Sequence, residues 1–213
     1  PDLEELALLP HDATVFGVSF SPDGHKLATG DSEGSWHIWS RNPTTGSWNR
    51  DSSHQAHLGN CDGVQWSPDG TALATGGRDQ VVRLWRWAPG GRIERREFKG
   101  HSGRITGLAF SPNGQNLFSA SQDKTIRRWH LSPTTQADGL YPGGVGLGLS
   151  MAFSPSGRWL ARPGTSNSTE IVEVATWQKQ GEVNGRWPAF ASDESWLATV
   201  ISTNQVQFTE TGT

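Results

Sequence analysis

The sequence has almost no cysteine, little net charge and no long apolar run. Cys61 is the only cysteine among 213 residues, so no disulfide can form within the chain, and we expect a reducing, cytoplasmic compartment. The formal net charge is −3 at pH 7, which gives no global electrostatic reason to bind nucleic acid or an anionic membrane. No run approaches the roughly 20 apolar residues that span a bilayer. We therefore expect no nucleic-acid partner and no membrane partner.

The patterns of metal, phosphate and cofactor sites are also missing. The seven histidines do not show metal-ligand spacing, and one cysteine cannot build a thiolate cluster. The glycine-rich stretch at 143–150 lacks the Lys-Ser/Thr ending of a phosphate-binding loop. Helical composition is confined to residues 2–9. We therefore expect no metal, no cofactor and a chain built of β-strands.

Glycine (26) and proline (12) are frequent instead, and they mark turns in a repeated phrase. The phrase "FSPDG" at 20–24 returns as "WSPDG" at 66–70, "FSPNG" at 110–114 and "FSPSG" at 153–157, and a degenerate copy, "FASDE", lies at 190–194. The copies are roughly 40–45 residues apart, a period that suits a unit of four strands. Proline fixes φ in such a turn and glycine accepts positive φ. The phrase therefore predicts a turn between two strands of a repeated unit.

Three of the units resemble the WD-repeat family. The third, "GHSGRITGLAFSPNGQNLFSASQDKTIRRWH", has the Gly-His pair at Gly100-His101, the turn phrase, and Trp129 at the end of its third strand. The second unit carries "LATGGRDQVVRLW" and the first "LATGDSEGSWHIW" in the same register. The aspartate that usually follows the tryptophan is replaced each time. The sequence of the repeats is also similar to that of bacterial WD-repeat proteins. The replaced positions are Ser40, Arg86 and His130.

The resemblance implies an all-β fold, a β-propeller of four-stranded antiparallel blades with about five blades present. Family members usually close with seven blades, so two interpretations stay open. The chain is an arc of a seven-bladed ring, which its start at Pro1 and its abrupt end favour, or five blades close with residues 3–9 as the last strand. An open ring would expose apolar faces and allow self-association. The units are expected at 10–40, 54–87, 98–131, 140–177 and 181–213, the last two being degenerate.

The resemblance also implies a hydrogen-bonded network of four residues inside each well-matched blade. A His, a hydroxyl and an acid together are also the residue set of a catalytic triad, but three copies around a ring favour a structural role. Glu33 departs from the usual aspartate, and its longer side chain is expected to loosen the turn. The network residues are His11, Thr29, Glu33 and Trp39 in the first unit, His57, Thr75, Asp79 and Trp85 in the second, and His101, Ser119, Asp123 and Trp129 in the third.

The function that the resemblance implies is a non-catalytic scaffold that binds a peptide or protein on the narrow face of the propeller. In the family, contact positions lie early in the first strand and just before the turn acid. Phe16, an aromatic residue at an otherwise polar position, is the main anchor candidate. The alternative is that it plugs the channel or caps a neighbouring blade. The candidate partner-binding residues are Phe16, Ser32, Asn60, Asp62, Arg78, Arg104, Thr106 and Gln122.

Two other functions stay open. Bacterial WD-repeat proteins are often attached to signalling domains such as kinases, so the chain is alternatively the regulatory domain of a larger signalling enzyme. Residues 78–104 are rich in arginine and offer an electrostatic site for acidic partners. Within this stretch, 92–99 is expected to be the outermost strand of a blade, where charges protect an exposed edge.

Overall fold

The computed structural model describes residues 7–131, 137–142, 150–165, 167–202 and 205–211, and these residues form nineteen strands in five antiparallel sheets. The first sheet contains β1 (Val15–Phe20), β2 (Lys26–Asp31), β3 (Ser35–Arg41) and β4 (Trp48–Gln55). The second contains β5 (Cys61–Trp66), β6 (Ala72–Gly77), β7 (Val82–Trp87) and β8 (Ile93–Phe98). The third contains β9 (Ile105–Phe110), β10 (Asn116–Ser121), β11 (Thr125–His130) and β12 (Ala137–Pro142). The fourth contains β13 (Ala152–Phe153), β14 (Trp159–Pro163), β15 (Ser168–Glu173) and β16 (Lys179–Asn184), and the fifth β17 (Arg186–Phe190), β18 (Trp196–Ser202) and β19 (Gln205–Glu210).

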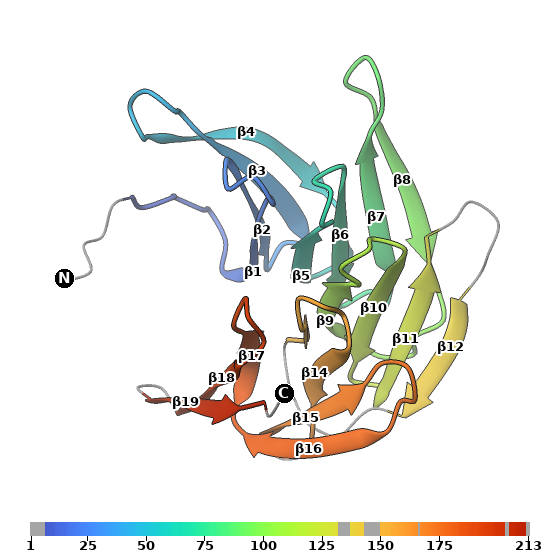
Figure 1. The fold of residues 1–213 in the computed structure, drawn as a ribbon. Helices are drawn as coiled ribbons and strands as arrows, with labels where there is room; N and C mark the ends of the chain where they lie inside the picture. The colour runs from blue at the N-terminus through green and yellow to red at the C-terminus, as the bar shows by residue number, and fades with distance from the viewer. Residues whose placement is uncertain (1–6, 132–136, 143–149, 166, 203–204, 212–213) are drawn as a thin grey trace.

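The five sheets are arranged around a common centre as the blades of a propeller (Figure 1). Within each sheet the strands pair in chain order, and the first strand is the innermost. The innermost strands of successive sheets contact one another, from β1 to β5, β9, β13 and β17. Figure 1 shows the arc open between β1 and β17. The expected all-β fold of antiparallel propeller blades is confirmed.

The repeated phrase forms a tight turn between the first two strands of each sheet. In the first sheet the Gly24 amide donates to the Ser21 carbonyl oxygen at 2.9 Å, and Gly24 has a φ of 71°. In the degenerate fifth copy the amide of Glu194 donates to the Ala191 carbonyl at 3.0 Å, with a φ of 62°. A non-glycine residue rarely adopts this conformation. The fifth copy therefore keeps the turn at the cost of backbone strain.

Neighbouring sheets bury the apolar residues of the inner strands between them. Val64 and Trp66 of β5 are each 5% exposed, whereas Val18 and Phe20, at the same positions in β1, are 65% and 59% exposed. The side chains are of the same kind, so the difference comes from packing. In the described part of the chain, β1 belongs to the end of the arc and lacks the cover that buries Val64 and Trp66.

The limits of the units differ in part from the sequence expectation. The predicted outermost strand at 92–99 is present as β8. The first sheet, however, extends to β4, which lies largely between the units expected at 10–40 and 54–87. Residues 7–9 are outside any strand, and Leu8 is 80% exposed. The rest of the closing strand expected at 3–9 falls outside the described residues.

Candidate partner-binding site

A polar network lies inside the third blade. The Trp129 indole nitrogen donates to Ser119 Oγ at 2.7 Å, and this oxygen lies 2.8 Å from His101 Nε2. His101 Nδ1 lies 2.7 Å from the carboxylate of Asp123. Asp123 also accepts the backbone amide of Thr125 at 2.9 Å and so fixes the turn between β10 and β11. The network therefore satisfies a buried indole and anchors a surface turn at the same time.

The second blade repeats this network. His57 joins Asp79 through Nδ1 and Thr75 through Nε2, both at 2.8 Å, and the Trp85 indole donates to Thr75 at 2.9 Å. Arg83 is an addition, because it donates to Asp79 at 2.6 Å. Burial raises the pKa of Asp79, but the interactions with His57 and Arg83 outweigh this effect and hold the pKa well below its usual value. Asp79 is therefore ionised at neutral pH.

The first blade departs from the expected network at Glu33. The hydroxyl of Thr29 lies 2.8 Å from His11 Nε2 and accepts the Trp39 indole at 3.1 Å. The acid of this blade, however, is Asp31, which is 4% exposed and accepts the backbone amides of Glu33 and Ser35. The expected role of Glu33 was therefore wrong. The acid that anchors the turn lies two residues earlier in the chain, and Glu33 itself is exposed.

Asp31 also has a different histidine partner. Its second carboxylate oxygen lies 2.8 Å from Nε2 of His37, while Nδ1 of His11 contacts the carbonyl oxygen of Leu9 at 2.9 Å. Burial raises the pKa of Asp31, but the hydrogen bonds from His37 and the turn amides outweigh it and keep the pKa below its usual value. The sequence prediction chose Glu33 because it aligns with Asp79 and Asp123 of the other two blades. The burial of Asp31 and its contact with His37 show that Asp31 takes the role instead.

These networks are structural in their geometry. The hydroxyls of Thr29, Thr75 and Ser119 are at most 1% exposed and already accept a tryptophan N–H. A nucleophile must reach a substrate, and a buried hydroxyl between an indole and an imidazole does not. The triad interpretation therefore lacks an accessible nucleophile in these blades.

A β-bulge occurs at the start of the inner strand in each of the three well-matched blades. The register between inner strand and second strand skips one residue, and the extra residues are Phe16, Asp62 and Thr106. A bulge leaves one residue unpaired and changes the direction of its side chain. Three candidate positions chosen from the sequence are therefore the bulged residues, which the sequence pattern did not reveal.

The turns before the acids lie beside these bulges. The backbone amides of Ser32, Arg78 and Gln122 donate to the carbonyl oxygens of Thr14, Asn60 and Arg104 at 2.8, 3.0 and 2.9 Å. Each hydrogen bond joins the turn after the second strand to the start of the inner strand, at a residue two positions before the bulged one. The same end of the three blades thus carries all eight candidate residues.

Five of the candidate residues form a connected cluster, which we call the Phe16–Arg104 cluster (Phe16, Ser32, Asn60, Asp62 and Arg104). The Arg104 guanidinium donates to both carboxylate oxygens of Asp62 and lies 5.7 Å from the centre of the Phe16 ring. With its amide oriented to suit both neighbours, Asn60 donates to the Ser32 carbonyl and accepts from Arg104, each at 3.2 Å. The cluster joins side chains of three blades.

The candidate residues differ in accessibility. Phe16 is 47% exposed, and Arg78 and Gln122 are exposed as well. Thr106 is only 4% exposed and points its hydroxyl at the Ala120 carbonyl at 3.4 Å, so it is too buried to contact a partner. Asp62, at 8% exposure, positions Arg104 rather than facing solvent.

The basic side chains expected along residues 78–104 are partly paired within the protein. Arg83 lies between Asp79 and Glu97, at 2.6 and 3.0 Å. Glu97 also lies 3.7 Å from Arg95 and 3.5 Å from Lys99. These pairs engage Arg83, Arg95 and Lys99 within the protein, so fewer basic side chains remain available to an acidic partner.

Two negative findings concern the described residues. No three His, Cys, Asp or Glu side chains in this part of the chain gather as metal ligands would. The same part contains no helix that is long and apolar enough to cross a membrane.

Antiparallel sheets repeat around one centre, and each of the first three contains a buried set of tryptophan, hydroxyl and histidine. These features define a repeat protein of the β-propeller class. The family model of the WD domain, G-beta repeat, matches residues 4–40, 48–86 and 93–130, more than half of the chain. The chain belongs to this WD-repeat family. Domains of this family are generally protein-interaction scaffolds and are typically non-catalytic. No curated protein matches the chain.

Proposed function

We propose that this chain is a non-catalytic scaffold that binds a peptide or protein segment on the narrow face of the propeller, with Phe16 as the anchor. The observation that carries the proposal is the half-exposed Phe16 ring, which lies under the guanidinium of Arg104. Aromatic residues that are exposed and well positioned dominate binding energy at protein interfaces.

The cluster around Phe16 supports this function through preorganisation. Asp62 is buried and holds Arg104 by two hydrogen bonds, and Arg104 in turn limits the movement of the Phe16 ring. A side chain that is ordered before binding loses less conformational entropy in the complex. Arg78, exposed and without an ion pair among the described residues, adds a positive charge for an acidic group of the partner.

The test begins with peptides selected from a displayed random library on the immobilised full chain. The dissociation constant of a selected peptide is then measured by fluorescence anisotropy. Phe16→Ala should weaken binding by at least about tenfold, as removal of an interface hot spot does. Arg78→Glu should weaken it further for acidic peptides.

Phe20→Ala is the matched control, because Phe20 is an exposed phenylalanine at the other end of the same strand. It should leave the affinity unchanged. If Phe20→Ala abolished binding while Phe16→Ala did not, the partner would bind at the opposite end of the strands, and the proposal would be wrong.

A further inference from the structure

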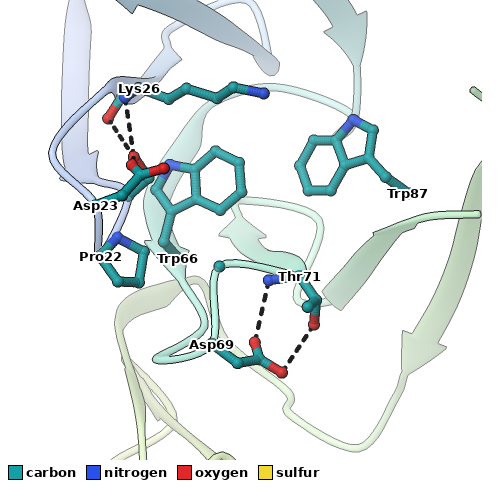
Figure 2. Close-up of a pocket in the computed structure, with 9 residues that line it drawn as sticks. Pro22, Asp23, Lys26, Trp66, Asp69, Thr71 and Trp87 are labelled. Atoms are coloured by element: carbon teal, nitrogen blue, oxygen red, sulfur yellow. Dashed lines mark hydrogen bonds between the residues drawn. The ribbon is translucent and has the colours of Figure 1, made fainter.

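A pocket between the first two blades has no role in the function proposed above. Its volume is about 370 Å³, and it lies between the turn after β1 and the turn after β5. Figure 2 shows Asp23 and Lys26 on one side, Asp69 and Thr71 below, and the indoles of Trp66 and Trp87 facing the space. These turns join the first and second strands, so the pocket lies at the opposite end of the blades from Phe16.

Two parallel indoles form the aromatic wall of this pocket. The rings of Trp66 and Trp87 have centroids 5.0 Å apart and an interplanar angle of 14°. Trp66 is 5% exposed and therefore fixed, whereas Trp87 is 37% exposed and presents its ring to solvent. An exposed indole that is held by a buried one is a rigid binding surface for a flat or cationic group.

The tryptophan of each buried network lies beside an arginine of the same chain. The guanidinium carbons of Arg50, Arg95 and Arg127 lie 5.8, 5.8 and 6.0 Å from the ring centres of Trp39, Trp85 and Trp129. No arginine of the described residues lies over Trp66 or Trp87 in this way. Among the described residues, this pair of indoles therefore lacks the arginine that lies beside Trp39, Trp85 and Trp129.

The charges around the pocket favour a cation. The side-chain hydrogen bond from Ser21 lowers the pKa of Asp23, and the one from Ser67 lowers that of Asp69, so both carboxylates are ionised at neutral pH. One carboxylate oxygen of Asp23 accepts from Ser21 and from the backbone amide of His25, which leaves the other oxygen for a ligand. Lys26 is the opposing charge, and it is exposed at the end of a flexible stem.

We propose that this pocket binds an arginine side chain of a partner protein. The guanidinium stacks on Trp87 and is attracted by Asp23 and Asp69, since a planar guanidinium combines ring stacking with carboxylate hydrogen bonds better than an ammonium does. Lys26 opposes this binding by charge repulsion. The site is independent of the Phe16 face, so the two can bind different segments of one partner.

The experiment uses the full chain with ¹⁵N-labelled tryptophan and follows the indole N–H signals by NMR. The probe is N-acetyl-arginine amide, and its uncharged isostere N-acetyl-citrulline amide is the matched ligand control. The arginine probe should shift the Trp66 and Trp87 signals saturably, and the citrulline probe should not. N-acetyl-aspartate amide tests the opposite charge.

The variants separate the contributions. Trp87→Ala should weaken binding by about fivefold or more, and the double change Asp23→Asn, Asp69→Asn by about threefold or more. Lys26→Gln should strengthen binding, and Trp196→Ala, which removes an exposed indole of the fifth sheet, should leave it unchanged. Equal binding of citrulline, or binding of the aspartate probe that Lys26→Gln abolishes, would overturn the proposal.

Discussion

Ser119→Ala tests whether the buried network stabilises the blades. Ser119 is fully buried, and its hydroxyl is shared by the indole of Trp129 and the imidazole of His101. The substitution removes one oxygen atom and leaves the side-chain volume almost unchanged. It deprives two buried polar groups of their partner, and each such group costs about 1–3 kcal/mol. Because the blade can relax around the change, we expect a loss of about 2–4 kcal/mol in the free energy of unfolding.

The assay is urea denaturation at pH 8, followed by tryptophan fluorescence and by circular dichroism. Ser119→Thr is the control, because Thr29 and Thr75 fill the same position in the other two blades and make the same two contacts. It should change the free energy of unfolding by less than about 1 kcal/mol. If alanine cost less than about 0.5 kcal/mol, or threonine cost as much as alanine, the hydroxyl would not be the stabilising group.

Two further predictions concern the acids and the histidine of these networks. Asp31→Ala should destabilise the protein by about 1–3 kcal/mol because it leaves buried partners unmatched, whereas Glu33→Ala should stay within about 0.5 kcal/mol; equal losses in a denaturation assay would contradict the assignment of Asp31. Burial lowers the pKa of His101 below its ordinary 6.5 despite Asp123, so the unfolded chain binds more protons and stability should fall as the pH drops below 6.5. For Asp123, burial raises the pKa, but hydrogen bonds from Thr125 and His101 outweigh it and lower the pKa from 3.8 to about 2, so a second loss should follow as the pH falls from 3.8 through about 2. Urea midpoints measured across this range should show both losses, and His101→Gln should remove the first.

The sequence was sufficient for the architecture where local chemistry repeats. The turn phrase, the Gly-His pair and Trp129 lie at fixed spacings, and each acts within one blade, so the resemblance located them correctly. The outer strand β8 was also predictable, because its charges follow the pattern of an exposed edge. β4 was not, since its polar run "WNRDSSHQ" has little strand propensity of its own, and the pairing with β3 supplies its hydrogen bonds.

The candidate site depended on contacts between blades, which a single sequence does not encode locally. Asp62 and Arg104 are 42 residues apart in the chain. The sequence of neither repeat indicates that these two side chains form an ion pair. The bulges at Phe16 and Asp62 were equally hidden, because one unpaired residue does not disturb the alternation of a six-residue strand. Asp31 was missed for a different reason. Two acids occupy one turn, and only burial shows which of them accepts the turn amides.

The anchored turns explain how the residues of the proposed binding face can differ between blades without loss of the fold. In the third blade Asp123 fixes the turn from inside, so the preceding Gln122 reaches solvent in a defined place. In the first blade Asp31 performs the same task from a different position, and the amide of Ser32 still meets the carbonyl of Thr14. Because the support lies beneath the surface, the exposed residues of the turn contribute little to stability. These exposed residues can therefore differ from blade to blade to suit a partner, because other, buried residues stabilise the fold.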